Sequence, residues 1–348
     1  MPRIAVSAAL ALASCATSPQ PPNDIPSCDP DPAFAPGAWQ GSAVDVPMAI
    51  TPVGSDGAMR FSINIEIGDS PLDVLLDTGS TGLRVMPGAV PDSAFACATT
   101  IASTYSYKSG LQLDGVVARA TITIGGVATP APIPVTYTDS VTCAPVNPDC
   151  VADGLSGFHA ILGIGLRNGA AAVGSPIAQL PGQPSFVVHA PGYDAGSGTL
   201  TIGPNDTSAF MTLQLPAASD DGTLANGTPA WDDHYGIPTC LDDVTAGVDY
   251  CEPAMWDTGN PAITIDWPPA ADNSELAVES QIAVTIGPPA APIDSYAFTV
   301  GTQPVPGIDE IDVEPADGEG FLNLGTALFF RADALFDPLH GIVGLAAH

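Results

Sequence analysis

Two aspartates lie in closely similar surroundings far apart in the chain. Residues 75–80 read LLDTGS, and residues 255–260 read MWDTGN, so Asp257 follows Asp77 by 180 residues. A carboxylate beside a buried strand is costly unless it has a partner. If the two turns meet, the like charges cannot both stay ionised, so one carboxyl keeps a proton. Such a pair can activate water, because the carboxylate accepts a proton while the acid donates one to a carbonyl under attack.

Each aspartate follows an apolar, strand-like run and is followed later by a second apolar segment that leads into glycine. The companion segments are FHAILGIGL (158–166) and FLNLGTALF (321–329). A single Asp-Thr-Gly indicates only a tight turn. Two copies with matched companions, about half a chain apart, predict a duplicated lobe.

The order of these segments resembles that of the pepsin-like aspartic peptidases. In each lobe of that family a hydrophobic-hydrophobic-Asp-Thr-Gly-Ser/Thr turn precedes a hydrophobic-hydrophobic-Gly segment. Residues 75–80 and 161–163 match in full, whereas 255–259 and 323–325 match less closely. The resemblance runs from about residue 58 to the end, where residues 323–348 are similar to the family's closing helix and strands. It implies a mostly β, bilobal fold of two duplicated β-barrel-like lobes with a cleft between them, and an endopeptidase that needs no metal or cofactor.

The resemblance also assigns site residues. Asp77 and Asp257 are the expected catalytic dyad. Gly79 and Gly259 let the backbone approach the carboxylates and supply N–H donors. Thr78 and Thr258 are expected to hydrogen-bond across the lobes, and Ser80 and Asn260 follow the two turns.

A hairpin is expected to close over the substrate and exclude water. In STYSYKSGLQLDGVVARATITIGG (103–126), Tyr107 takes the family's flap tyrosine position and Gly110 lies at the turn, before a strand at 116–124. Tyr105 points to the same face of a regular strand and competes for that role. Cross-strand packing is the alternative role for either tyrosine.

Three departures from the family pattern bear on activity. Asn260 stands where Ser or Thr is usual, and its amide can still donate to the aspartate. The usual Trp after the first motif is absent, and Arg84 lies near its place. Arg84 is either a charge beside the dyad or, as we favour, a surface or ion-paired residue. No Lys or Arg lies between Ala16 and Met59, so a basic prosegment is missing. These departures motivate an alternative, an inactive pepsin-like surface lipoprotein that binds peptide or glycan in the cleft. The intact Asp-Thr-Gly pair favours the enzyme.

The charge balance is strongly acidic. Seven basic residues, with Lys108 the only lysine, face 38 acidic ones, which gives −31 at pH 7. Nucleic acid and anionic membrane surfaces are therefore not expected partners. Acid tolerance and simple solubility explain the charge about equally well. With 45% apolar residues, 36 Gly and 37 Pro, the chain is typical of a β-rich, loop-rich globular protein.

The N-terminus predicts export. Residues 1–15, MPRIAVSAALALASC, read as a signal peptide with a bacterial lipobox that ends at Cys15, the expected lipidation site; an ordinary signal peptide is the alternative. Residues 16–57 are then a Pro-rich tether and N-terminal extension. We expect a monomer in the bacterial cell envelope, anchored to the outer membrane or cell surface only by this lipid, with a peptide or protein substrate.

Six cysteines remain after Cys15. The near pairs Cys143/Cys150 and Cys240/Cys251 can each staple a hairpin or loop, which leaves Cys28 with Cys97. The sequence alone leaves other connectivities open. Disulfides fit an oxidising compartment.

The lobes are expected at 58–207 and 208–348. Strand patterns occupy 59–68, 118–126 and 198–204, and a helical pattern occupies 324–335. The five histidines form no pair with metal-ligand spacing in sequence, and the acidic stretch 308–320 indicates a solvated loop rather than a calcium site. Residues 68–71 favour a turn over a serine nucleophile, and 163–165 lack a dinucleotide fingerprint.

Overall fold

The computed structural model describes most of the chain from residue 24 onward. The described residues are 24–28, 35, 37–53, 58–145, 147–152, 157–167, 173–218, 223, 227, 229–301, 308, 311–316 and 318–348. The expected signal peptide, Cys15 and most of the expected tether lie outside them. Within these residues, no helix is long and apolar enough to cross a membrane.

The fold is mostly β, with 52% of the described residues in strands and 5% in helical turns. The strands of the first half are β1 Val44–Val53, β2 Ala58–Ile67, β3 Ser70–Asp77, β4 Thr81–Val85, β5 Cys97–Ser106, β6 Leu111–Ala120, β7 Ile122–Ile124, β8 Val127–Ala128, β9 Ile133–Cys143, β10 Ala160–Ile164, β11 Ser185–His189 and β12 Ser197–Gly203. Those of the second half are β13 Met211–Gln214, β14 Pro238–Asp243, β15 Val248–Met255, β16 Ile263–Trp267, β17 Ser274–Glu275, β18 Gln281–Ile286, β19 Asp294–Thr299, β20 Ile311–Pro315, β21 Phe321–Asn323, β22 Ala332–Asp337 and β23 Ile342–Ala347. The 3-10 turns are η1 Asp92–Ala94, η3 Ile177–Gln179, η4 Tyr193–Ala195, η5 Thr207–Ala209 and η6 Thr326–Leu328.

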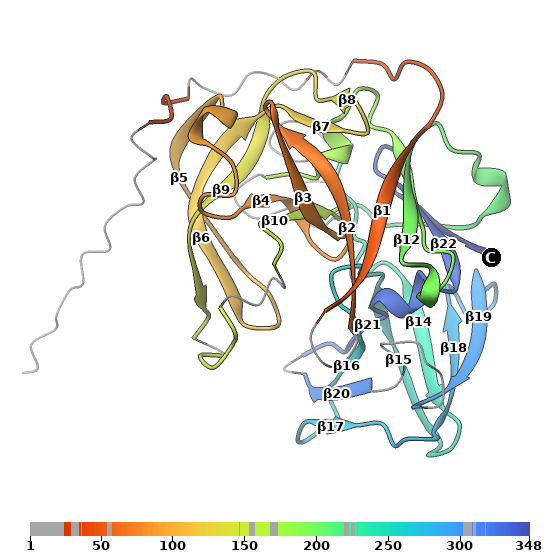
Figure 1. Cartoon of the computed structure of the whole chain (residues 1–348). Coiled ribbons are helices and arrows are strands. Elements are labelled where there is room, and N and C mark those ends of the chain that lie inside the picture. The colour runs from red at the N-terminus through yellow and green to blue at the C-terminus, as the bar shows by residue number, and fades with distance from the viewer. Residues whose placement is uncertain are drawn as a thin grey trace, which may run out of the picture.

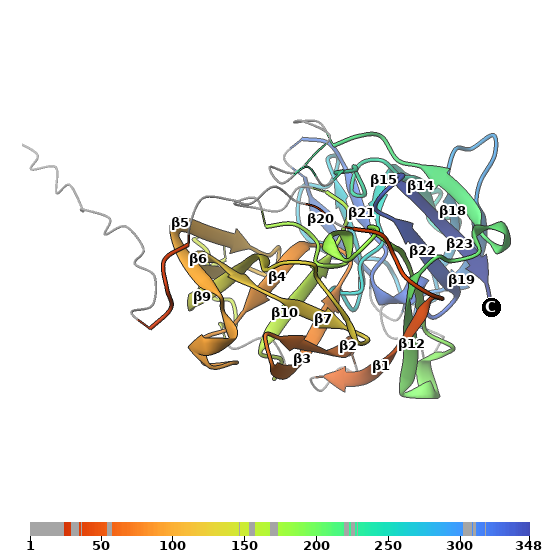
Figure 2. The same ribbon diagram turned by 90° about the horizontal axis from the view of Figure 1, so that it is seen from above.

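The strands form two sheets. The larger, curled into a half-barrel, has the order β13-β23-β22-β11-β12-β1-β2-β3-β10-β4-β9-β6-β5, with β7 paired to β2 and β8 paired to β7. The smaller has the order β17-β20-β16-β21-β15-β14-β18-β19. Strands β3–β10 lie on one side of the molecule and β14–β21 on the other, and the view from above agrees (Figures 1 and 2). The two Asp-Thr-Gly turns therefore come from opposite sides.

The two halves of the chain share one sheet. Strand β22 of the second half pairs with β11 of the first half, so strands from both sides of residue 207 are neighbours, and β23 and β13 continue the same sheet. Phe186 of β11 stacks on Phe336 of β22 with ring centroids 4.9 Å apart, and both rings are buried. This shared sheet joins the two sides through backbone hydrogen bonds and apolar packing.

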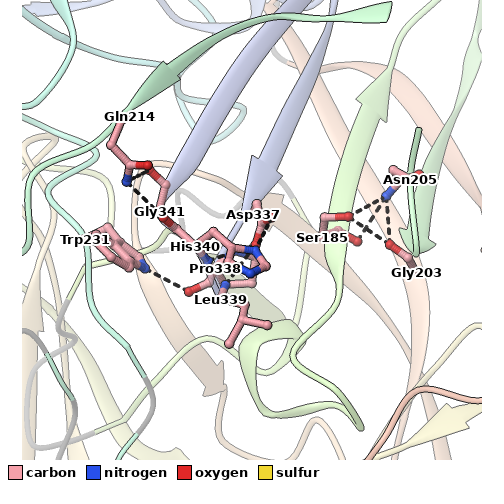
Figure 3. Close-up of polar contacts among 10 residues, drawn as sticks. All are labelled: Ser185, Gly203, Asn205, Gln214, Trp231, Asp337, Pro338, Leu339, His340 and Gly341. Atoms are coloured by element: carbon pink, nitrogen blue, oxygen red, sulfur yellow. Dashed lines mark hydrogen bonds and ion pairs between the residues drawn. The ribbon is translucent and has the colours of Figure 1, made fainter. Parts of the chain in front are cut away.

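The turn between β22 and β23 is held by residues from elsewhere in the chain (Figure 3). The Trp231 indole donates to the Pro338 carbonyl at 2.8 Å, and the Gln214 amide donates to the Gly341 carbonyl at 3.0 Å. Gly341 has φ +66°, and a Cβ there would lie 2.1 Å from the Trp231 ring, so only glycine fits. These contacts hold Gln214 and Trp231 against the turn between β22 and β23.

Several predicted elements agree with the structure. The patterns at 59–68 and 198–204 correspond to β2 and β12, and that at 118–126 covers the end of β6 and all of β7. All three predicted cysteine pairs form disulfides: Cys28–Cys97, Cys143–Cys150 and Cys240–Cys251.

Two local predictions are wrong. The helical pattern at 324–335 contains only the turn η6 and then enters β22, because pairing with β11 and β23 holds that segment extended and buries Ala332, Ala334 and Leu335. The segment 308–320, predicted as a solvated loop, contains β20, a strand of the smaller sheet in which Ile311 and Val313 are buried. In both segments, strand pairing in the tertiary structure determined the backbone conformation, which differs from the one that local composition indicated.

Part of the N-terminal extension belongs to the sheet. Strand β1 pairs with β2 and β12, and the Cys28–Cys97 disulfide with a Ser27–Ala98 bridge holds residues 24–28 against β5. Of the expected 16–57 tether and extension, these described segments are folded onto the larger sheet.

Candidate active site

The two Asp-Thr-Gly turns are held by the same arrangement of three strands. Strand β10 runs parallel to β3 and antiparallel to β4, with Gly163 beside Asp77 in the register. Strand β21 likewise runs parallel to β15 and antiparallel to β16, with Asn323 beside Met255. The companion segment therefore lies between the strand that enters each turn and the strand that leaves it, so the sequence repeat is also a structural one.

Four hydrogen bonds join the two turns through their threonines. The Thr78 N–H donates to the Thr258 hydroxyl oxygen at 3.0 Å, and the Thr258 N–H donates to that of Thr78 at 2.9 Å. Each hydroxyl in turn donates across the interface, Thr78 to the Trp256 carbonyl and Thr258 to the Leu76 carbonyl. Both threonines are buried. The hydrogen bonds expected between Thr78 and Thr258 are thus present, with near two-fold symmetry.

The glycines that follow the threonines bring the carboxyl groups together. A Cβ at Gly79 would lie 2.3 Å from Cγ of Asp257, and a Cβ at Gly259 would lie 2.5 Å from Oδ1 of Asp77. Real side chains do not approach so closely, so each turn approaches the opposite carboxyl only because it carries glycine. Asp77 and Asp257 are 4% and 7% exposed, which makes them a buried, facing pair.

Each carboxyl accepts one hydrogen bond from a backbone N–H and one from a side chain, and the side-chain donor differs between the two aspartates. For Asp77 the donors are the Gly79 N–H (2.9 Å) and the Ser80 hydroxyl (2.5 Å). For Asp257 they are the Gly259 N–H (2.7 Å) and the Asn323 amide (2.7 Å). The two aspartates therefore have unlike outer partners, a hydroxyl and an amide.

Asn260 does not take the role expected of it. Its amide donates to the Ala262 carbonyl at 2.9 Å, within its own turn, rather than to the aspartate. Asn323 supplies the donor instead. In the register Asn323 corresponds to Ile161 of the first half, so an amide replaces an apolar residue of the companion segment. That imperfect match was the sequence signal for Asn323, but it gave no direction for the side chain.

The amide of Asn323 has a fixed orientation. Its Oδ1 accepts the Gly325 N–H at 2.9 Å, which leaves Nδ2 facing Asp257. An amide nitrogen only donates, so Oδ2 of Asp257 must accept. Each oxygen of Asp257 therefore accepts one hydrogen bond, Oδ2 from Asn323 and Oδ1 from Gly259.

Burial dominates the ionisation of Asp257. Burial first, and then the charge of Asp77, raise the pKa of Asp257 to about 7, against the lowering effect of the hydrogen bonds from Asn323 and Gly259. Because the two carboxyls titrate as a unit, the pair holds one proton over the acidic range.

The dyad lies in a cleft of about 440 Å³. Residues from both sides line it, including Arg60, Asp77, Ser80, Tyr105, Tyr107, Lys108, Ile161, His234, Asp257, Asn260, Thr264, Asp266, Glu314, Phe321 and Asn323. Arg60 donates to the Gly259 carbonyl at 2.5 Å, so one basic residue is held beside the second turn. The cleft is large enough for several residues of an extended peptide.

The predicted hairpin covers one edge of this cleft. Strands β5 and β6 are joined by a turn in which the Gly110 N–H donates to the Tyr107 carbonyl at 2.9 Å, and Gly110 has φ +88°. Tyr105 and Tyr107 both line the cleft, with ring centroids 4.8 Å apart. The buried Tyr107 hydroxyl lies near Ser80 without reaching hydrogen-bond geometry. The hairpin thus places Tyr107 close to the first turn, and Tyr105 beside it.

Arg84 does not lie at the surface, one of the two roles that we favoured for it, and it forms no ion pair with any residue that the structure describes. It is 2% exposed, its guanidinium lies 3.6 Å from the centroid of the Tyr105 ring, and it donates to the Gly82 and Thr81 carbonyls. It also reaches the Ser80 hydroxyl at 3.4 Å. Carbonyl oxygens and an aromatic face replace a counter-ion here. Arg84 is therefore connected through Ser80 to Asp77.

Lys108 spans the cleft from the tip of the hairpin. Its ammonium lies 2.5 Å from Asp266 of β16 and 3.2 Å from Glu314 of β20, and its side chain is half exposed. We predict that Lys108→Met raises amide hydrogen exchange at residues 107–111 by about two- to fivefold, because an exposed pair contributes on the order of 0.5–1 kcal/mol. Lys108→Arg is the matched control and should exchange like the parent. Equal exchange in all three proteins would show that the ion pairs do not hold the hairpin.

A further buried carboxyl, that of Asp233, lies behind the first turn. Oδ2 of Asp233 accepts the Leu166 N–H at 2.5 Å, while its Oδ1 has no hydrogen-bond partner among the described residues. Burial is the main cause that raises the pKa of Asp233 to about 7. The neighbouring His234 has its pKa lowered to about 3, first by burial and then by the charge of Arg167. His234 is therefore neutral above that pH, and its Nε2–H donates to the Gly79 carbonyl at 3.1 Å.

The raised pKa of Asp233 predicts a pH-dependent stability difference. Between about pH 4 and 7 the folded protein keeps a proton on Asp233 that the unfolded chain has lost, so the contribution of this group falls as pH rises. Asp233→Asn should be nearly neutral at pH 4 and increasingly stabilising, relative to the parent, up to about pH 7, above which the difference should stay constant. The expected size is about 1.4 kcal/mol for each unit by which the pKa is raised.

Denaturant unfolding at a series of pH values measures this difference. Asp69→Asn is the matched control, because Asp69 is exposed and the substitution removes the same charge. A difference between parent and Asp233→Asn that stays constant from pH 4 to 7 contradicts the buried, protonated state.

Comparison with protein-family models and with curated proteins found no match for this chain.

Proposed function

We propose that the protein is an aspartic endopeptidase with a pepsin-like fold. The observation that carries the proposal is the facing pair Asp77 and Asp257, buried at the base of a cleft and approached by two repeated turns that are hydrogen-bonded to each other. The resemblance in sequence supports the same proposal. Structural use alone does not explain why two buried carboxyls are held face to face, since like charges in a dry site are unfavourable.

The surroundings of the two carboxyls suit them to different roles. Asp257 acts as the acid of the pair, because its burial and the charge of Asp77 raise its pKa to about 7. Asp77 acts as the base of the pair and accepts hydrogen bonds from Gly79 and Ser80. Asp77 then takes a proton from water as the water oxygen attacks the peptide carbonyl carbon, while Asp257 donates its proton to the carbonyl oxygen. In the collapse of the resulting diol, Asp77 gives its proton to the amide nitrogen and Asp257 takes a proton from a hydroxyl, so the C–N bond breaks and the starting protonation of the pair returns.

The direct test is cleavage of an acid-unfolded protein by disulfide-intact protein across about pH 2–7. The parent should cleave, and Asp77→Asn and Asp257→Asn, each shown to be folded, should not. Folded but inert parent protein overturns the endopeptidase and leaves the binding protein, with a cleft for peptide or glycan. Binding that survives loss of either aspartate supports that second function.

Asn323 gives a further test of the acid role assigned to Asp257. Its hydrogen bond lowers the pKa of Asp257, so Asn323→Ile, which copies Ile161 of the first half, should raise that pKa. The alkaline limb of the pH–rate profile should then move to higher pH, while the maximal rate falls. Asn260→Ala is the control, because Asn260 does not contact the carboxyl, and it should leave the limb in place. An unchanged limb in Asn323→Ile contradicts the assignment.

We also propose that the protein acts in the bacterial cell envelope, tethered by lipid on Cys15. The signal-like pattern of residues 1–15 and the three disulfides support export. Metabolic labelling with a radioactive fatty acid should mark the parent and not Cys15→Ser, which should also leave the membrane fraction. Equal labelling of both proteins overturns the anchor.

A further inference from the structure

Two histidines far apart in the sequence meet one aspartate on a face of the shared sheet. Asp333 lies on β22, between β11 and β23. The register of β11 with β22, continued by one residue, places His189 directly opposite Asp333. On the other side Asp333 faces Ala346, and His348, two residues on, is its diagonal neighbour on the same face. Three neighbouring parts of the sheet thus direct nitrogen and oxygen donors to one place.

The donor atoms are already close together. Nδ1 of His189 lies 2.5 Å from Oδ1 of Asp333, and Nε2 of His348 lies 3.0 Å from the same oxygen. All three atoms lie within 4.8 Å of one another, and the imidazole centroids are 5.2 Å apart. The side chains are partly exposed, so solvent and ions can reach them.

This donor set selects a particular class of ion. Two imidazole nitrogens and one carboxylate oxygen suit zinc and similar divalent transition metals, whereas magnesium and calcium prefer oxygen alone. In a tetrahedral site with bonds of 2.0–2.1 Å, the donor atoms lie about 3.3 Å apart. The observed separations require adjustments of about 1.5 Å or less at partly exposed side chains. The net charge of −31 favours any cation.

We propose that His189, Asp333 and His348 form a binding site for a divalent transition-metal ion, with zinc as the representative. An ion at this place ties β11 and β22 to the residue that follows β23. Because the three donors meet only in the folded chain, binding stabilises the sheet shared by the two halves. The site is separate from the Asp77–Asp257 cleft and does not depend on the proposed peptidase activity.

Calorimetric titration of metal-free, full disulfide-bonded protein with zinc sulfate tests the proposal, with protein purified without a histidine tag. One zinc ion should bind per chain at pH 7.5, and magnesium should not compete. His189→Ala and His348→Ala should each weaken zinc binding by about 10-fold or more, since even outer partners of metal ligands contribute 10- to 100-fold. Asp333→Asn should do the same.

His340→Ala is the matched control. His340 also pairs with an aspartate, Asp337 at 2.8 Å, but it lies outside the cluster. It should bind zinc like the parent. Zinc should also raise the unfolding temperature of the parent and of His340→Ala, but not that of the three cluster variants. Absence of zinc binding in the parent, or binding that all three cluster variants retain, overturns the site and leaves the residues as histidine–carboxylate pairs.

Discussion

Replacing Thr258 by valine is expected to lower the free energy of unfolding by about 2–4 kcal/mol. Valine keeps the shape of threonine but removes the hydroxyl, which accepts the Thr78 N–H and donates to the Leu76 carbonyl. Both groups then lose a partner in a buried interface, and each buried polar group left unpaired costs about 1–3 kcal/mol. The lost hydrogen bonds are two of the four that join the two Asp-Thr-Gly turns.

Two variants control for this effect. Thr258→Ser keeps the hydroxyl and should recover most of the stability. Thr51→Val changes an exposed threonine of β1 and should shift stability by less than about 0.5 kcal/mol. Denaturant unfolding, with the midpoint and slope compared, is the measurement. A Thr258→Val protein as stable as the parent means that water or backbone movement replaces these hydrogen bonds.

Gly79→Ala is expected to reduce cleavage by about 100-fold or more while the protein remains folded. Its Cβ would lie 2.3 Å from Cγ of Asp257, so the two carboxyls must separate by about 1 Å, a displacement that can cost 10²-fold in rate. Gly259→Ala should act in the same way from the opposite side, because its Cβ would lie 2.5 Å from Asp77. The two turns can share a proton only while both carry glycine.

The control is Gly192→Ala, whose Cβ meets nothing within 4 Å. It should cleave like the parent. The unfolding midpoint gives a second reading of Gly79→Ala that does not depend on activity, and it should fall because the carboxyl contact is strained. A Gly79→Ala protein with parental cleavage and stability contradicts the close approach of the two turns.

The site residues that belong to the sequence repeat could be predicted. Asp77 and Asp257 are each followed by Thr-Gly, and the structure brings these threonines and glycines together. The strands that lead into the turns and two of the strand patterns elsewhere were equally visible, because alternation of buried and exposed residues is a local property. The number and spacing of the cysteines suggested one pairing among several that the sequence left open, and the three disulfides have that pairing.

The direction of single side chains was not predictable. Asn260 was expected to donate to Asp257, but its amide turns back to Ala262, and Asn323 donates instead. Arg84 was expected at the surface, yet it lies buried against Tyr105. Each outcome depends on which acceptor is nearest in space, and residues near in sequence do not determine that.

The sequence by itself determined the mostly β class, the duplicated turns and the identities of the facing aspartates, because these rest on repeats and periodicity. Only the tertiary structure decided which strands are neighbours. The segment at 324–335 became strand because β11 and β23 lie beside it. His189 and His348 have no metal-ligand spacing in sequence, yet they meet at Asp333 because sheet pairing brings strands from both halves together. The spacing of two residues in the sequence predicts how close they lie only when both belong to one helix or strand. Contacts between strands depend on how the whole sheet pairs and packs.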